Sequence, residues 1–303
     1  MTIVQTSKAV YLGIDIGGTK ILAAAVSSTG RVLSRAKAKV PKGASSREVF
    51  ELAAGLSKAA LGGRLPRAIG VGVPGIVSPK GDKVLVAPNI KIAGFPLAAR
   101  LKDRFKAHAV IGNDVSVGLL GEAWKGAAKG KKNVIGLFPG TGLGGGAIVD
   151  GKILLGAHGA AAEFGHIVVV RGGRRCGCGK RGCLEAYSSR SAIEKALGGA
   201  QMKSKAIKKA LARREWDVVG AVREASEHLA DAAVSLRQVF DPELILLGGG
   251  LVEACGAFIL PIVRKALDTD PFFTRTIGRC PVKAAALGDD AIVVGAAKLA
   301  SCL

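Results

Sequence analysis

Two segments of this chain share one pattern, and that repetition constrains the fold more than any other feature. Residues 9–37 alternate apolar runs with glycine turns, and residues 133–156 do the same. Apolar runs joined by short glycine turns are typical of antiparallel strands. A chain of 303 residues is also long enough for two ordinary domains. The sequence therefore predicts a duplicated α/β architecture in which each half contains a three-strand meander.

The first turn of each meander is a candidate phosphate-binding loop. Glycine lets backbone N–H groups approach a phosphate, because it has no side chain in the way. Thr19 and Thr141 each add a hydroxyl, and Asp15 precedes the first turn, where it can hold a magnesium-bound water. The residues of the two loops are Asp15, Gly17, Gly18, Thr19 and Lys20, and Gly140, Thr141 and Gly142. A plain hairpin is the alternative for either turn taken alone, and the pair predicts two loops facing one cleft.

The stretch from Glu163 to Glu185 predicts a metal site. Its ligand candidates are His166, Cys176, Cys178 and Cys183, with glycines between the cysteines that let a short loop wrap a small ion. Three thiolates and one imidazole suit tetrahedral zinc, and four protein ligands make the closed, structural kind of site. Three solvated cysteines in a cytosolic loop are the alternative.

Two carboxylates flank this cysteine loop. Glu163 is near His166 in sequence and Glu185 is near Cys183, so a bound zinc would fix the approach of both carboxylates. Two rigid carboxylates and an imidazole nitrogen can hydrogen-bond neighbouring hydroxyls of a polyol. This set therefore predicts a sugar-binding site.

Asp114 has two interpretations. It stands where a buried strand ends and a helix begins within residues 109–128. It is either a helix N-cap or a general base at the carboxyl end of the sheet, where open α/β folds bind ligands. Local sequence does not choose between them.

The remaining periodicity predicts the rest of the elements. Residues 46–61 predict an amphipathic helix, and residues 68–75 a buried strand that ends at Gly75. A long helix has Val222, Leu229, Leu236 and Val239 on its apolar face. The strand 243–247 runs into Gly248, Gly249 and Gly250, which would lay backbone flat against adenine. The last segment, 285–300, reads as a turn followed by a small-residue helix, which is expected to pack on the first domain.

Composition narrows the function classes. The chain has 44 Lys+Arg against 23 Asp+Glu, so its net charge is +21 and it attracts polyanions. The basic residues are spread along helices, aromatic residues are only 4%, and no nucleic-acid module is recognisable, so no specific nucleic-acid partner is expected. The N-terminus has no secretory pattern, and the most apolar window, 244–263, is broken by glycines and Pro261, so a cytoplasmic protein without a membrane span is expected.

These motifs closely resemble the ROK family of sugar kinases and sugar-responsive repressors, in the actin-like ATPase superfamily. The resemblance covers essentially the whole chain. It rests on DIGGTK at 15–20, GVPG at 72–75, PN at 88–89, ND at 113–114, GTGLGGG at 140–146, EFGH at 163–166, CGCGKRGCLEAYSS at 176–189, LGGG at 247–250 and LGDDA at 287–291.

The resemblance implies a two-lobed, actin-like (ribonuclease H-like) α/β fold with an interdomain cleft and a zinc-binding loop. The small N-terminal domain would span residues 1–115 and be completed by a helix at 289–303. The large domain would span 116–288 and hold the second phosphate loop, the zinc site and the adenosine site.

The resemblance also implies an ATP-dependent hexose kinase with Mg²⁺ and structural Zn²⁺, most simply a glucokinase acting on the sugar 6-hydroxyl. Asp114 would be the base. The sugar residues would be Gly75, Asn89, Asn113, Glu163, His166 and Glu185. Only some eight residues precede the first strand, so the kinase branch is expected rather than the repressors with their N-terminal DNA-binding domain. A homodimer or homotetramer is expected.

Several alternatives remain at this point. The acceptor could be N-acetylglucosamine, N-acetylmannosamine, mannose or fructose, and the donor could be polyphosphate. A non-catalytic sugar sensor would have no use for Asp114 and two phosphate loops.

Overall fold

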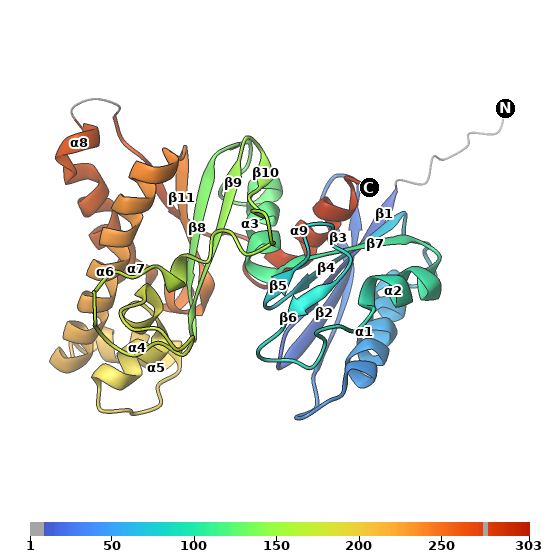
Figure 1. Ribbon diagram of the computed structural model, residues 1–303, viewed down its shortest axis with the longest axis horizontal. Coiled ribbons are helices and arrows are strands. Elements are labelled where there is room, and N and C mark those ends of the chain that lie inside the picture. Colours follow the sequence, from blue (N-terminus) through green and yellow to red (C-terminus); the bar gives the residue numbers. More distant parts are fainter. Residues whose placement is uncertain (1–8, 275–277) are drawn as a thin grey trace. The chain divides into compact units, whose positions relative to one another are not determined.

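The first meander is confirmed in the computed structural model, which describes residues 9–274 and 278–303. Strands β1 (Val10–Ile16), β2 (Lys20–Ser27) and β3 (Val32–Lys39) pair antiparallel in that order. Strands β4 (Ala68–Val73) and β7 (His108–Asn113) then join β1 in parallel, which gives the sheet order β3-β2-β1-β4-β7 (Figure 1). The carboxyl ends of β1, β4 and β7 therefore share one edge of this sheet.

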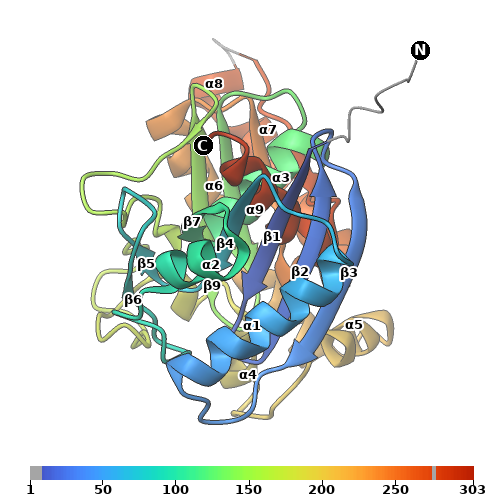
Figure 2. The ribbon, with the colours of Figure 1, turned by 90° about the vertical axis from the view of Figure 1, so that its right-hand side faces the viewer.

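Both faces of this first sheet are covered by helices. Leu12, Ile14 and Ile16 of β1 pack in the core beneath α1 (Ser46–Leu61) and α2 (Leu97–Phe105), whereas Tyr11 belongs to the opposite core with α9 (Ala291–Ala300). Side chains alternate between the two faces of a strand, so a strand covered on both faces reads as almost continuously apolar. Figure 2 shows α1 crossing the strands on one face.

Helix α1 has strong local signals at both ends. Ser45 is its N-cap, and Ser45 and Glu48 form a reciprocal capping box, while Gly62 ends the helix in the left-handed conformation. These signals are present in the sequence, and the helix has the predicted bounds of 46–61. A short ribbon of β5 (Ile76–Val77) and β6 (Val84–Val86) follows β4.

The C-terminal helix α9 packs directly on the first sheet and on α3 (Asp114–Lys125). A side chain at Gly70 in β4 would collide with the carbonyl of Ala296, and a side chain at Gly295 would collide with the carbonyl of Val117 in α3. Glycine is thus needed at these two close contacts between α9 and a neighbouring backbone. Because α3 and α9 pack together, both belong to the same compact unit.

The chain divides into two compact units. The first comprises residues 1–129, 155–161 and 289–303, and the second comprises 130–154 and 162–288. The boundary expected at residue 115 falls inside α3, whereas the first unit continues to Lys129 because α3 packs on α9. The short segment 155–161 also groups with the first unit, which no sequence signal indicated.

The second unit repeats the opening arrangement. Strands β8 (Val134–Pro139), β9 (Leu143–Val149) and β10 (Lys152–Ile153) form the second antiparallel meander. Strands β11 (Leu244–Leu247) and β12 (Val282–Ala284) extend the sheet in parallel, in the order β10-β9-β8-β11-β12. The duplicated α/β architecture is therefore confirmed within each unit.

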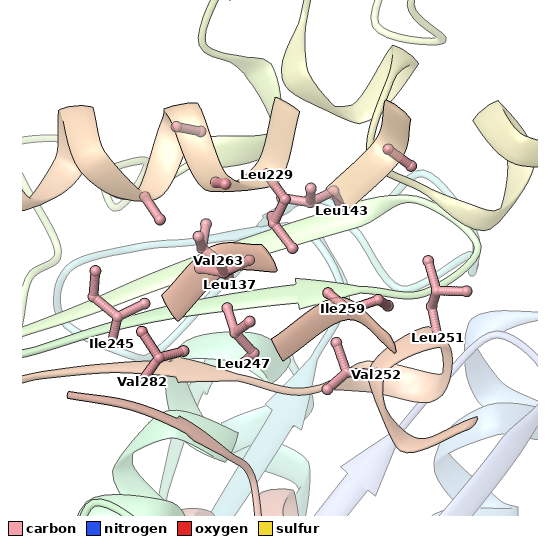
Figure 3. Close-up of a cluster of buried hydrophobic side chains, with 14 of the residues drawn as sticks. Leu137, Leu143, Leu229, Ile245, Leu247, Leu251, Val252, Ile259, Val263 and Val282 are labelled. Carbon is pink, nitrogen blue, oxygen red and sulfur yellow. The ribbon is translucent and has the colours of Figure 1, made fainter. Parts of the chain in front are cut away.

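Helices cover the second sheet and build its core. They are α4 (Arg190–Ala196), α5 (Ser204–Ala212), α6 (Trp216–Phe240) and α7 (Gly249–Thr269), and the short helix α8 (Pro271–Thr274) follows α7. Figure 3 shows Leu137, Ile245 and Leu247 of the strands packed with Leu229 of α6 and Ile259 of α7. The predicted apolar face of α6 is confirmed except at Val239, which is 73% exposed one residue before the helix ends.

Three short 3₁₀ turns complete the second unit and the start of the C-terminal segment. They are Phe164–His166, Leu184–Ala186 and Gly288–Asp290. Among residues 9–274 and 278–303, no helix combines the length and the apolar character that a membrane crossing requires.

Candidate functional site

The first glycine turn lies at the carboxyl end of β1. The Gly17 N–H donates to the carbonyl of Lys20 at 2.9 Å, which closes the turn. A Cβ at Gly18 would lie 2.8 Å from the backbone oxygen of Asn89, so glycine is required there by close approach of another segment. The structure thereby brings the exposed Asn89 beside the first glycine turn.

Two carboxylates meet at the same sheet edge. Asp15 pairs with Gly72 of β4, which pairs with Gly112 of β7, and Asp114 follows two residues later at the start of α3. Asp15 is only 7% exposed, and burial raises its pKa to about 7, with the nearby Asp114 adding to the rise and Lys20 opposing it. Burial also raises the pKa of Asp114, although the Val115 N–H donates to its Oδ1 at 2.8 Å. A buried carboxyl with a raised pKa is suited to accept a proton near neutral pH.

The N-cap of α3 is Asn113 and not Asp114. The Asn113 Oδ1 accepts from the Ser116 N–H at 3.0 Å, and its Nδ2 donates to the Gly75 carbonyl, also at 3.0 Å. The N-cap interpretation of Asp114 is therefore wrong, because the neighbouring amide fills that role. Asn113 keeps one N–H and one oxygen lone pair for a ligand.

Lys20 is ion-paired at the surface. Its Nζ lies 2.8 Å from the Asp289 carboxylate, and Arg35 pairs in the same way with Asp290. The Lys20 pair is well exposed on both sides, and exposed pairs contribute little free energy. A phosphate group could therefore take Lys20 from Asp289 at little cost.

The second glycine turn joins β8 to β9. The Gly140 N–H donates to the Gly142 carbonyl at 2.8 Å, and the carbonyls of Gly140 and Thr141 accept from the N–H groups of Arg190 and Ser191. The Thr141 hydroxyl accepts from Arg190 Nη2 at 2.9 Å. The segment that follows the cysteine loop thus holds the second glycine turn through hydrogen bonds.

The four predicted metal ligands come together. The Sγ atoms of Cys178 and Cys183 are 3.7 Å apart, and the Sγ of Cys176 is 3.7 Å from His166 Nδ1. All four ligand atoms lie within 4.8 Å of one another. Two ligands that each lie about 2.3 Å from one tetrahedral zinc are about 3.8 Å apart, so the cluster has the right size. Burial raises the pKa of Cys176 to about 12, so a bound cation is what would hold this sulfur as a thiolate.

Glu185 connects the cysteine cluster to the second glycine turn. Its Oε2 accepts from the Leu143 N–H at 2.9 Å, and its Oε1 lies 3.5 Å from the Sγ of Cys176. A side chain at Gly142 would collide with the Glu185 carboxylate. Glu163 is exposed in the same unit, just before the 3₁₀ turn that carries His166.

Packing inside the protein explains two of the three glycines at 248–250. A Cβ at Gly248 would lie 2.6 Å from the Phe138 ring, and one at Gly249 would lie 2.7 Å from the Pro139 carbonyl. Gly250 is exposed, and a Cβ there would lie 3.9 Å from the Ser204 hydroxyl. Of the three, Gly250 alone offers open backbone, and the adenine contact stays a prediction.

Sequence reasoning did not identify Arg190 or the structural role of Asn113. The Arg190–Thr141 contact joins residues 49 apart. No local pattern of the kind used above signals such a pair. The Asn113 cap could have been found, since asparagine is among the preferred N-cap residues.

Comparisons with known proteins agree with this arrangement. The sequence model of the ROK family matches residues 11–302. A glucokinase from Streptomyces coelicolor is 34% identical over 309 aligned positions, covering 95% of this chain and 96% of the relative.

Solved structures agree as well. A ROK family glucokinase from Streptomyces griseus, solved with glucose and AMPPNP, superposes with a TM-score of 0.81 at 34% identity, covering 97% of this chain and 100% of that one. A ROK hexokinase from Thermus thermophilus has a TM-score of 0.83 at 29% identity, covering 97% and 98%.

Proposed function

The chain belongs to the ROK family, and we propose that within it the protein is a glucokinase that transfers the γ-phosphate of ATP to the 6-hydroxyl of glucose. Relatives named glucokinase match it at 31–34% identity over 94–95% of its length. The structure with glucose and AMPPNP, an ATP analogue, covers nearly the whole of both chains. The observation that carries the proposal in this chain is the half-buried Asp114 carboxyl, which follows β7 at the carboxyl edge of the first sheet and has a raised pKa.

The residues proposed to bind the sugar, which is the phosphoryl acceptor, carry hydrogen-bonding groups. We assign the sugar hydroxyls to Glu163, His166 and Glu185 of the second unit and to Asn89, Asn113 and the Gly75 backbone of the first. His166 turns Nδ1 toward Cys176, so its other ring nitrogen is left for a hydroxyl. Carboxylates accept hydrogen bonds from hydroxyls, and several such bonds in one geometry distinguish one sugar from its epimers.

The residues proposed to bind ATP, which is the phosphoryl donor, lie mainly in the two glycine loops. Gly17 to Lys20 and Gly140 to Gly142 present backbone N–H groups and the hydroxyls of Thr19 and Thr141 to phosphate oxygens. Gly248 to Gly250 would lie against adenine, with Gly250 the most accessible of them. Magnesium bound with ATP supplies charge neutralisation, and Asp15 would orient one of its waters.

Asp114 is the proposed general base. Its carboxylate accepts the proton of the 6-hydroxyl as that oxygen attacks the γ-phosphorus, and ADP leaves with the bridging oxygen. Burial favours the protonated form of Asp114, which makes the carboxylate a stronger base than an exposed aspartate. Positioning and charge neutralisation by the loops supply much of the remaining stabilisation of the transition state.

The cysteine cluster is proposed to hold one structural zinc. His166, Cys176, Cys178 and Cys183 form a complete set of four protein ligands, so no position would be left for water. The ion would fix the backbone that carries Glu163, His166 and Glu185.

The variant Asp114→Asn tests the base directly. It keeps the shape and removes the proton acceptor, so turnover should fall by about 10² to 10⁴-fold. Glucose affinity, measured by calorimetry, should stay within a few-fold. Asp103→Asn, which neutralises an exposed carboxylate on α2, is the matched control and should keep full activity. Turnover by Asp114→Asn at a third of the original rate would exclude Asp114 as the base.

Two further expectations concern the location of the protein and its assembly. A cytoplasmic location would keep the cluster thiols reduced for zinc. Assembly as a homodimer or homotetramer follows from the family resemblance and is measured by analytical ultracentrifugation.

A further inference from the structure

Arg190 contacts the second phosphate loop with both its side chain and its main chain. Its Nη2 donates to the Thr141 hydroxyl at 2.9 Å, and its N–H donates to the Gly140 carbonyl at 2.9 Å. The Arg190 side chain is 26% exposed, so its guanidinium is partly shielded from water. None of the roles assigned so far uses this cation.

The hydrogen bond fixes what the Thr141 hydroxyl can do. A hydroxyl has one hydrogen to donate and two lone pairs to accept. Since Arg190 fills one lone pair, the Thr141 hydrogen is directed elsewhere and is available to a phosphate oxygen. The guanidinium also places a positive charge next to the Thr141 oxygen, and therefore close to any phosphate that this hydroxyl binds.

The surroundings hold Arg190 in this position. Glu194, one turn further along α4, places Oε1 3.5 Å from Arg190 Nε and also accepts from the Met202 N–H at 2.9 Å. Arg190 Nε is buried and has no hydrogen-bond partner within residues 9–274 and 278–303. The carboxylate therefore orients the guanidinium by charge and leaves its Nη2 for Thr141.

The surface beside this loop is cationic. A hollow with a volume of about 290 Å³ is lined by Thr141 and Gly142 together with Arg175 and Lys195. Glu185 is the one carboxylate in its lining, and it already accepts from the Leu143 N–H. Positive charge around an exposed threonine hydroxyl favours an anionic ligand such as a phosphate.

We propose that Arg190 is a positioning residue for the terminal phosphates of the nucleotide, acting through the Thr141 hydroxyl. The inference rests on the proposed function, because it needs Thr141 to contact the donor. Arg190 orients the hydroxyl as a donor and adds positive charge, while its main-chain bond to Gly140 supports the loop whatever its side chain is.

Nucleotide binding to purified variants tests this inference. Arg190→Met removes the charge and the donor and keeps the main-chain bond to Gly140. Its affinity for ADP and AMPPNP, measured by calorimetry, should fall about tenfold or more, the loss of one hydrogen bond to a charged group. Affinity for AMP and the glucose KM should not change. Arg190→Lys should recover part of the loss.

A double-mutant cycle separates positioning from general charge. Thr141→Val should weaken AMPPNP binding by a similar factor, and the double variant should lose less affinity than the sum of the two single losses, because both substitutions remove one shared contact. Arg213→Met is the matched control, since it removes an equally large cation from an exposed site, and it should bind AMPPNP normally.

Three results would overturn the inference. They are unchanged AMPPNP affinity in Arg190→Met, an equal loss for AMP, or fully additive effects in the cycle. A wild-type protein that binds AMPPNP and phosphorylates glucose while Arg190→Met does both equally well would refute the Arg190 role alone. A wild-type protein that does neither would refute the proposed function with it.

Discussion

Asp15 is a residue of the first unit whose protonation depends strongly on folding. Its side chain is almost fully buried, and Asp114 adds a second carboxyl at the same sheet edge. Lys20 is the cation that opposes the rise, while Lys20 itself is paired with Asp289. An aspartate with a pKa raised from 3.8 to about 7 is held protonated by the folded state in a range where the unfolded chain would release the proton.

This raised pKa predicts a pH dependence of stability. The folded state binds the extra proton between about pH 4 and pH 7, so its stabilising effect is complete below about pH 4 and is lost as pH rises through about 7. Without nucleotide and magnesium, Asp15→Asn should therefore gain stability relative to the wild type as pH rises from 5 to 8, by at most ~3 kcal/mol, because about two pH units of this range lie below the raised pKa. Chemical unfolding across this range measures it. Asp150→Asn, at an exposed turn, is the control, and its stability should follow that of the wild type across this pH range. The prediction would be contradicted if the stability of Asp15→Asn changed with pH in parallel with that of the wild type.

At the residue scale, the residues of a site could be predicted from the sequence where one short segment contains the whole motif. His166, Cys176, Cys178 and Cys183 converge as predicted, because they lie within one stretch of the chain. The roles of Asn113 and Arg190 were not predicted. Arg190 contacts a turn far away in sequence, and only Asp114, one residue after Asn113, was considered from the sequence as a possible N-cap.

Elements were predicted well where periodicity and caps agree. Both meanders, helix 46–61 and the C-terminal helix formed as expected, since apolar alternation, glycine turns and the Ser45 capping box are all local signals. The end of the first unit at Lys129 was not predicted, because it follows from packing of α3 on α9. The exposure of Val239 likewise depends on where the core ends.

The cysteine loop is the element whose removal should change both stability and sugar binding. Zinc would cross-link His166 to the cysteines, and Glu185 lies against Cys176. A strong chelator or Cys178→Ser should therefore lower the melting temperature and raise the glucose KM together. Metal analysis should find about one zinc per chain for a four-ligand site of this type.

Cys302→Ser is the matched control for that experiment, because Cys302 is also an exposed thiol and lies outside the cluster. It should keep its zinc and its glucose KM. A fully active, metal-free preparation with the original glucose KM would contradict the role of the loop.

The whole molecule carries a net charge of +21, and this charge bears on the phosphoryl donor. Spread-out lysines and arginines attract any polyanion, but salt at ~0.15 M screens exposed charges beyond about 8 Å. Activity with ATP should therefore vary only modestly with salt. Activity with inorganic polyphosphate should be weaker and should fall steeply as salt rises. A higher kcat/KM for polyphosphate than for ATP at ~0.15 M salt would make the charge a functional feature of donor binding.

The acceptor preference tests the central claim most directly. The measurement is kcat/KM with ATP for glucose, N-acetylglucosamine, N-acetylmannosamine, mannose and fructose, with Asp114→Asn as the inactive reference. Glucose should give the highest value, with the phosphate on its 6-hydroxyl, since the carboxylates and the imidazole around the zinc loop are assigned to its hydroxyls. A clear preference for an N-acetylated hexosamine, or no phosphoryl transfer to any of these sugars, would contradict the assignment as a glucokinase.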